Sequence, residues 1–144
     1  MVDPVPSGYH TVTPYLVVAD AEGLIAFVKA AFQAAEFSRT LRPDGTIANA
    51  GLRIGDSFLM VAQARDPWKP MPTGFYLYVP DTDATYQAAL AAGGISLLEP
   101  SDQFYGDRNA GVQDAWGNNW WIATHIEDVD EAEIQLRLGI LNQP

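Results

Sequence analysis

The feature that most constrains this fold is an internal repeat with a period of about 61 residues. The segment Val18-Ala-Asp20 is matched by Val79-Pro-Asp81, 61 positions later. The turn Ile54-Gly-Asp56 is matched by Trp116-Gly-Asn118, 62 positions later. Repeated units of this kind usually exist because one copy cannot bury its own sheet face. The 144 residues are therefore expected to form two modules of a single domain.

The first module reads as a strand, a helix and three further strands. Residues 11–18 are rich in β-branched and aromatic side chains, which is typical of a strand. From Ala21 the apolar residues follow an i, i+3, i+4 spacing, which predicts a helix to about Gln33 with Asp20 as its N-cap. Further strands are expected over residues 37–41, 46–54 and 57–62. Module 1 therefore covers about residues 8–64.

The second module repeats this order after a proline-rich linker at residues 65–73. Asp81 is expected to cap a helix over residues 84–92, and strands are expected over residues 75–79, 95–99, 111–114 and 119–124. Module 2 covers about residues 74–126, and a short acidic helix follows over residues 129–138. The two halves predict an α+β fold, in which tandem βαβββ modules form a curved mixed sheet around a cleft with the helices outside.

The charge and the absence of cysteine exclude several classes of function. The chain has 8 basic and 18 acidic residues, a formal net charge of −10 and no cysteine. A disulfide scaffold, a thiolate metal site and a cysteine nucleophile are therefore excluded. Nucleic acid and membrane are not expected as partners, because anionic surfaces repel this one. Without a signal-like N-terminus or a membrane-length apolar run, we expect a cytoplasmic protein.

Three segments resemble a known family. They are residues 8–18, the segment containing Tyr105-Gly-Asp-Arg108, and residues 114–128, which include Ala123-Thr-His-Ile-Glu-Asp128. Together with the repeat, they resemble the vicinal-oxygen-chelate superfamily of glyoxalases, bleomycin-resistance proteins and extradiol dioxygenases, and most closely its PhnB-like branch. The resemblance implies paired βαβββ modules and a homodimer. It says little about the reaction, because this scaffold supports isomerases, dioxygenases, transferases and binders that catalyse nothing.

The resemblance also implies where a divalent metal would bind. Carried over by register, the four ligand positions of the family fall on Thr13, Leu59, Gly74 and Trp121. None of these is a plausible ligand, since a metal site needs His, Asp, Glu or similar donors. His10 precedes the first strand and His125 follows the last, and a His-Ala-Glu triplet of the PhnB-like branch corresponds to Asn49-Ala-Gly51 here. We therefore expect no metal cofactor and assign no catalytic residue.

Strand alternation predicts which side chains face the cleft. The expected lining is aromatic and largely uncharged, and it consists of Thr13, Tyr15, Asn49, Leu59, Val61, Tyr76, Tyr78, Tyr105, Asn119 and Trp121. The alternative is that these aromatic side chains are ordinary core. Asp107 and Arg108 are expected to lock the loop that contains Tyr105 by an ion pair. His125 is interpreted as part of a helix-start cluster with nearby carboxylates.

The leading hypothesis is a metal-free protein that binds an aromatic or cationic small molecule in this cleft, as in the bleomycin-resistance type. One alternative is a metal-dependent lyase, isomerase or dioxygenase with a displaced site, acting on a small carbonyl or aromatic substrate. Another is a dimeric partner-binding module whose cleft is filled by side chains. The C-terminal helix carries an apolar stripe of Ile134, Leu138 and Leu141, which fits packing across a dimer or back onto its own sheet.

Overall fold

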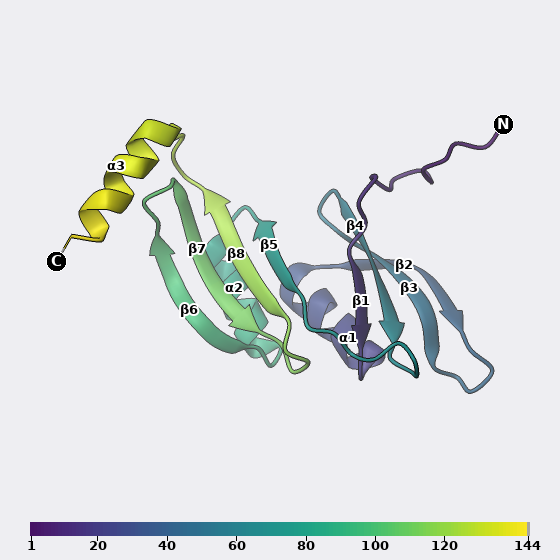
Figure 1. Ribbon diagram of the computed structural model, residues 1–144. Coiled ribbons are helices and arrows are strands. Elements are labelled where there is room, and N and C mark those ends of the chain that lie inside the picture. The colour runs from purple at the N-terminus through teal and green to yellow at the C-terminus, as the bar shows by residue number, and fades with distance from the viewer. Residues whose placement is uncertain (144) are drawn as a thin grey trace.

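The computed structural model describes residues 1–143 and contains two four-stranded sheets and three helices (Figure 1). The first module consists of β1 (Tyr15–Val18), α1 (Ala21–Phe32), β2 (Ala35–Leu41), β3 (Ile47–Ile54) and β4 (Ser57–Gln63). The second consists of β5 (Gly74–Tyr78), α2 (Thr82–Ala91), β6 (Ile95–Asp102), β7 (Asp107–Gln113) and β8 (Asn119–His125). The last element is α3 (Glu131–Leu141).

The two sheets have the same topology, which confirms the repeat. Their strand orders are β1-β4-β3-β2 and β5-β8-β7-β6. In each sheet the first strand runs parallel to the fourth, and the other neighbours are antiparallel. The predicted α+β fold of tandem βαβββ modules is therefore confirmed. The two sheets remain separate, with β1 and β5 as the edge strands that lie toward the junction between them (Figure 1).

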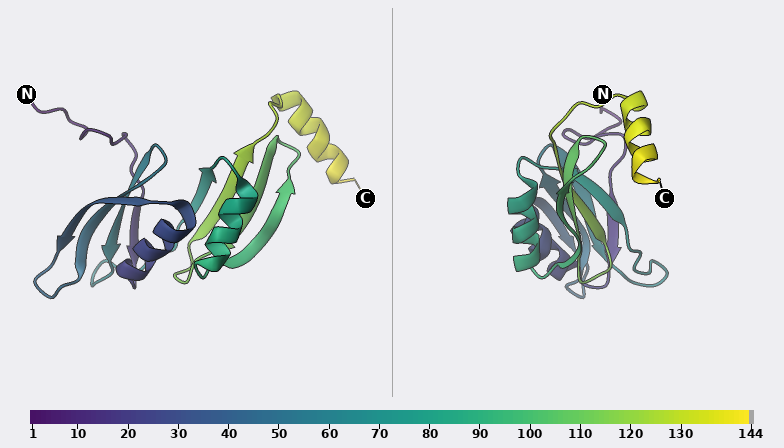
Figure 2. Two further views of the ribbon diagram at one scale, coloured as in Figure 1. Left: turned by 180° about the vertical axis from the view of Figure 1, so that it is seen from behind. Right: turned by 90° about the vertical axis from the view of Figure 1, so that its left-hand side faces the viewer.

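The helices α1 and α2 lie on the same side of the molecule and pack against each other (Figure 2). Beneath them Trp120 joins the two modules. Its ring stacks on Phe75 at a centroid distance of 4.3 Å and lies 4.9 Å from Phe32 of α1. Trp120 is fully buried, and aromatic pairs of this kind contribute about 0.5–1.5 kcal/mol beyond area burial. One aromatic cluster therefore makes the two modules a single unit.

The helix caps follow from the repeated aspartates. The Asp20 carboxylate accepts a hydrogen bond from the Gly23 amide at 3.0 Å, and the Asp81 carboxylate accepts one from the Ala84 amide at 3.0 Å. N-caps of this type stabilise a helix by about 0.5–2 kcal/mol, so the two aspartates are explained structurally. The C-terminal end of α1 is unusual, because Gln33 adopts a left-handed conformation with φ 57°.

The segment between β6 and β7 is shorter than the loop expected over residues 100–110. β6 extends to Asp102 and β7 begins at Asp107, so a short turn joins them. Gly106 makes this turn possible with φ +100°, and a Cβ there would lie 2.1 Å from the Glu127 carbonyl oxygen. Asp107 and Arg108 are consecutive residues of a strand and therefore point to opposite faces. The predicted ion pair between them is wrong: Arg108 pairs instead with Asp83 and Asp102, at 3.0 Å each.

The linker and the C-terminal helix lie at the periphery. The Met71 amide donates to the Val17 carbonyl at 3.1 Å, so the linker runs along the outer edge of β1. α3 buries none of its side chains and packs on neither sheet. Arg137 ties it to the chain by donating to the Phe104 carbonyl and to Glu127. No helix within residues 1–143 is long and apolar enough to cross a membrane.

Candidate functional site

The face of the second sheet opposite α2 carries a cluster of polar and aromatic side chains. The pairing of β5, β8 and β7 places Tyr76 beside Trp121 and Tyr78 beside Ala123, which in turn neighbours Asn109. Because alternate residues of a strand share a face, Asp107 at the start of β7 also lies on this side. We call this surface, defined by Tyr76, Tyr78, Tyr105, Asp107, Asn109, Trp121 and His125, the platform.

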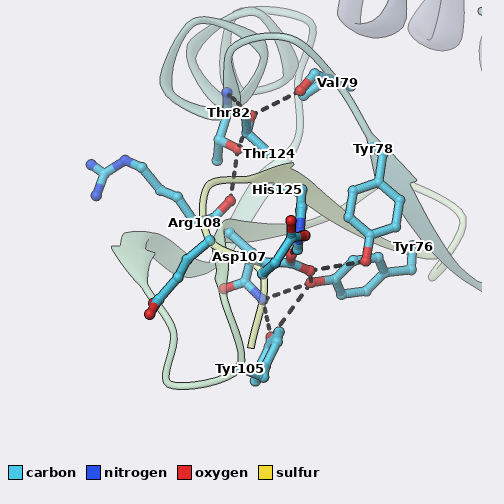
Figure 3. Close-up of polar contacts among 12 residues, drawn as sticks. Tyr76, Tyr78, Val79, Thr82, Tyr105, Asp107, Arg108, Thr124 and His125 are labelled. Atoms are coloured by element: carbon cyan, nitrogen blue, oxygen red, sulfur yellow. Dashed lines mark hydrogen bonds and ion pairs between the residues drawn. The ribbon is translucent and has the colours of Figure 1, made fainter. Parts of the chain in front are cut away.

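Asp107 is the centre of the platform and is buried, with 3% of its surface exposed. Its Oδ2 accepts hydrogen bonds from the hydroxyl of Tyr76 at 2.7 Å and from that of Tyr78 at 3.0 Å. Its Oδ1 lies 2.9 Å from Nδ1 of His125 (Figure 3). Burial raises the pKa of Asp107, but the three hydrogen bonds outweigh burial and hold that pKa below its usual range. The carboxylate is therefore ionised near neutral pH.

Hydrogen bonds hold the hydroxyls of Tyr76 and Tyr78, while the rings of both residues are exposed. Burial and the neighbouring Tyr105 hydroxyl raise the pKa of Tyr76, and the bond to Asp107 raises the pKa of Tyr78, so both phenols stay neutral and act as donors. Their rings meet edge to face, with centroids 5.4 Å apart and planes at 61°. Tyr76 is 43% exposed and Tyr78 is 66% exposed. The rings therefore form a rigid aromatic corner that is accessible from outside.

His125 lies between two carboxylates at the end of β8. Its Nδ1 faces Asp107, and its Nε2 lies 2.7 Å from Asp128. The bonds to Asp107 and then Asp128 raise the pKa of His125, which favours the imidazolium form. The interpretation of His125 as part of a helix start is wrong, because α3 begins only at Glu131, with Asp130 as its cap. The histidine instead helps to hold the buried carboxylate.

Asn109 supplies the polar part of a small pocket. Its Nδ2 donates to the hydroxyl of Tyr105 at 2.5 Å and to that of Tyr76 at 3.4 Å. Its Oδ1 is buried and has no hydrogen-bond partner among residues 1–143. The amide nitrogen faces Tyr76 because the Tyr76 hydroxyl hydrogen is committed to Asp107. The pocket has a volume of about 310 Å³, and Tyr76, Leu98, Gln103, Tyr105, Asn109 and Trp121 line it.

Trp121 lies close to the sheet because its neighbour on β7 is a glycine. A Cβ built on Gly111 would lie 2.3 Å from the Trp121 ring, which is far inside the contact distance. The indole can therefore occupy this position only above a residue without a side chain. Gly111 thus allows the Trp121 ring to lie close to the sheet on the platform.

A protein-family model described as the glyoxalase/bleomycin resistance protein/dioxygenase superfamily matches residues 9–122. This chain belongs to that superfamily. The two βαβββ modules agree with the fold that the resemblance implied.

A relative matches most of the chain in sequence, and two solved structures are similar in fold. The chain is 34% identical over 138 residues to the uncharacterized protein Rv0887c of Mycobacterium tuberculosis, a match covering 88% of this chain and 81% of that protein. The crystal structure of TioX from Micromonospora sp. ML1 is similar with a TM-score of 0.70 and 22% identity, over 81% of this chain and 99% of TioX. A PhnB protein from Bacillus cereus, described as a putative 3-demethylubiquinone-9 3-methyltransferase, is also similar, with a TM-score of 0.61 and 16% identity. The match covers 80% of this chain and 99% of the PhnB protein.

The positions to which we carried over the superfamily's metal ligands do not fit a divalent ion in this chain. Leu59 lies in the core, Gly74 has no side chain, and the Trp121 indole offers only an N–H donor. Thr13 alone carries an oxygen, and it precedes β1. These residues cannot supply a coordination shell for a divalent ion.

Four residues of the expected cleft lining come together on the platform: Tyr76, Tyr78, Tyr105 and Trp121. Asn119 lies on the same face of β8, where its Oδ1 accepts a hydrogen bond from Gln113 at 3.0 Å. The expectation that Tyr105 reaches the cleft agrees with its bond to Asn109. The second module therefore gathers half of the expected lining.

The other expected lining residues belong to the first module. Tyr15 is 50% exposed on the open face of the first sheet, and Asn49 is half-buried on β3. Thr13 lies just before β1. Leu59 and Val61 were expected on the same face as Tyr15, and that placement is wrong: they are 4% and 0% exposed and lie on the helix side of the sheet. The register pairs Val61 with Leu16, which faces α1, and so puts both residues on the helix side.

The open face of the first sheet lacks a matching polar cluster and is packed with aromatic rings. Phe58 lies 4.9 Å from Tyr9 and 4.7 Å from Phe37 between ring centroids. Tyr9 comes from the segment before β1, so the chain covers part of this face itself. The two modules thus share a backbone plan but not a surface.

Asp107, Asn109 and His125 were not expected to form the centre of the site. One signal for Asn109 is present in the sequence: the triplet Asn49-Ala-Gly51 recurs as Asn109-Ala-Gly111, 60 positions later. In both modules the glycine lies under an aromatic ring, Phe37 or Trp121. The repeated triplet marks β7 as the equivalent of β3. The contact between Asp107 and His125 has no such signal.

Proposed function

We propose that this protein binds a small aromatic or cationic molecule on the platform, without a metal ion. The observation that carries the proposal is the aromatic corner of Tyr76 and Tyr78, whose hydroxyls are fixed on the buried Asp107 while their rings stay exposed. A phenol that donates to a carboxylate has a more electron-rich ring face. Such faces attract organic cations and stack on flat rings.

The charge of the protein favours a cation over an anion. The formal net charge is −10. On the platform, the one cationic group, His125, lies between the carboxylate of Asp107 and that of the neighbouring Asp128. A negative surface raises the local concentration of cations and slows the approach of anions. An anionic aromatic compound should therefore bind more weakly than a cationic one of the same shape.

The hydrogen bonds also reduce the entropic cost of binding. Ordering one flexible side chain on association costs about 0.5–1.5 kcal/mol. Tyr76 and Tyr78 are already held by Asp107 in the absence of a ligand, so binding does not need to order these two side chains. The pocket beside Asn109 adds a buried acceptor, its Oδ1, for a ligand N–H or O–H.

Titration calorimetry with benzyltrimethylammonium and benzenesulfonate tests the proposal. We expect the cation to bind and the anion to bind at least about tenfold more weakly. Tyr78→Ala should weaken the cation about three- to tenfold. Tyr15→Ala is the matched control, because Tyr15 is a similarly exposed tyrosine on the equivalent strand of the first sheet. Equal losses in both variants, or no binding of either compound, would contradict the proposal.

The metal-free character is tested separately. Elemental analysis of the purified protein after incubation with nickel, zinc, iron or manganese should give less than about a tenth of an equivalent of bound metal. Stoichiometric metal would contradict this part of the proposal and favour a metal-dependent lyase, isomerase or dioxygenase.

We also propose that the protein works as a homodimer. Leu136, Ile140 and Leu141 of α3 are 59%, 60% and 64% exposed, and this helix makes no extensive contact with another element of the described chain. A helix of 11 residues is marginal in water without tertiary packing, so a second copy is its expected support. Sedimentation velocity should show a dimer that Ile140→Glu weakens. A monomeric wild-type protein at about 100 μM would contradict the proposal.

A further inference from the structure

A cavity of about 480 Å³ lies at the junction of the two modules, on the other side of β5 from Asp107. Its walls come from both modules and include Phe32, Phe58, Leu59, Phe75, Leu77 and Trp120. The volume falls within the range of small-molecule sites, which is about 300–1,000 Å³. Tyr76 and Tyr78 border this cavity as well as the platform, because β5 is the wall between them.

The cavity exists because no helix covers the inner face of β5. α1 packs on β1, β3 and β4, and α2 packs on β6, β7 and β8, with no comparable contact to β5 from either within residues 1–143. Phe75 and Leu77 point toward the core side, yet they remain half-buried. Within residues 1–143, β5 also lacks a partner strand on its outer edge, since the two sheets do not join. An apolar strand face is thus left accessible at the junction.

The walls of the cavity are flat and rigid. Phe75 and Trp120 are stacked, with planes at 17°, and Trp120 is fully buried. Phe32, at the end of α1, is 7% exposed and packs on the same indole. These rings are held by the core and do not need to reorganise around a ligand. Their arrangement suits a flat apolar molecule.

The polar groups of the cavity lie at its rim. Asp56 is the one carboxylate of the lining, and it is exposed at the turn between β3 and β4. No cationic side chain of the described chain lines the cavity, so an anion would find no partner there. An uncharged molecule therefore fits this lining best.

Gln33 ends α1 in a left-handed conformation, in which its backbone N–H donates to the Val28 carbonyl. It is the one residue other than glycine with a positive φ in the described chain, and it lines the mouth of the cavity. Glycine is usual at such a left-handed position after a helix, because it adopts that conformation without strain. Strained residues of this kind gather at ligand sites. The exposed Gln33 amide can both donate and accept a hydrogen bond at the mouth.

We propose that this junction cavity is a second binding site, distinct from the platform, for a flat, uncharged, apolar molecule with one hydrogen-bonding group that meets Gln33. The apolar body of the molecule lies against the partly exposed Phe75 and Leu77, and the buried Trp120 supports Phe75 from behind. The site takes a different chemical class from the platform, because the carboxylate Asp107 lies on the opposite side of β5. The two sites can therefore be tested separately.

N-phenyl-1-naphthylamine is a suitable probe, since it is uncharged, aromatic, carries one N–H and fluoresces in apolar surroundings. We expect saturable one-site binding to the full chain. Ser57→Trp should weaken binding at least about tenfold, because Ser57 is an exposed lining residue and an indole there fills the mouth. Gln33→Ala should weaken binding about threefold to tenfold by removing one hydrogen bond. Trp121→Ala is the control, because Trp121 belongs to the platform and does not line the cavity.

The outcomes are distinguishable from those of the platform experiment. Unsaturable fluorescence, unchanged binding in both Ser57→Trp and Gln33→Ala, or an equal loss in Trp121→Ala would overturn the proposal. Thermal unfolding of each variant shows whether it is folded, and Gln33→Ala remains informative if Ser57→Trp is not. Binding of benzyltrimethylammonium should persist in Ser57→Trp, so failure at one site does not imply failure at the other.

Discussion

Replacing Asp107 by asparagine tests the network that holds the platform. In Asp107→Asn the shape is kept, but the bonds from Tyr76 at 2.7 Å and Tyr78 at 3.0 Å become bonds to a neutral acceptor. A hydrogen bond to a charged group contributes about 1.5–3 kcal/mol and a neutral one about 0.5–1.5, so each phenol bond loses about 1 kcal/mol. The bond from His125 adds little, because that side chain is half exposed. We expect a loss of about 2 kcal/mol in the free energy of unfolding, or about 4–8 °C in Tm.

Urea denaturation followed by far-UV circular dichroism measures this change. The matched control is Asp128→Asn, which removes the other carboxylate on His125 from a fully exposed position. Exposed pairs contribute about 0–1 kcal/mol, so the control should stay close to wild type. The reasoning is refuted if Asp107→Asn lies within about 0.5 kcal/mol of wild type, or if Asp128→Asn loses as much.

The same network predicts a dependence of stability on pH. The pKa of His125 is raised above 6.5 in the folded state, so its contribution is fully present below pH 6.5 and is lost as the pH rises through the folded pKa. The pKa of Asp107 is lowered below 3.8, so its contribution is present above pH 3.8 and is lost as the pH falls through the folded pKa. Wild type should lose stability as the pH rises above 6.5, and Asp107→Asn should lose less over the same rise. Parallel pH profiles would contradict the assignment.

Three further substitutions test the placement of single side chains, and urea denaturation reads the stability of each. Leu59→Ala should lower the free energy of unfolding by about 3 kcal/mol and leave binding of benzyltrimethylammonium unchanged, because Leu59 lies in the core. Lost binding at unchanged stability would contradict this. Gly111→Ala should lower the free energy of unfolding by about 1–3 kcal/mol and change the near-UV dichroism of Trp121, since the new methyl would lie 2.3 Å from the indole. An unchanged spectrum would contradict the contact. Gln33→Gly should stabilise by up to about 1 kcal/mol by relieving the left-handed strain, and a destabilised variant would contradict that strain.

Most of the fold could be predicted from the sequence, because the repeat and the change of hydrophobic period determine the order of elements. The caps at Asp20 and Asp81 mark the helix starts directly. The start of β7 was missed by four residues, since the strand begins at Asp107 and not at residue 111. Polar residues on the open face of a strand have the composition of a loop, and alternation alone does not separate the two.

The site could be predicted only in part, for two physical reasons. β5 alternates clearly between Phe75 and Tyr76, so its faces were assigned correctly. β4 is apolar on both faces, and its run of Phe58, Leu59 and Met60 gives no indication of which residue faces the helix. The bond between Asp107 and His125 joins two strands, and such a contact depends on strand pairing that the local sequence does not encode.

The platform and the junction cavity are linked through the register of β5. This strand is an edge that pairs only with β8, and in parallel, which is the less stable pairing. A slip of one residue would turn Phe75 and Leu77 toward Asp107 and the two tyrosines toward the cavity. The buried carboxylate would then lose both phenol donors, which makes the slip costly. The polar network on one side of β5 therefore also fixes which side chains form the apolar wall on its other side.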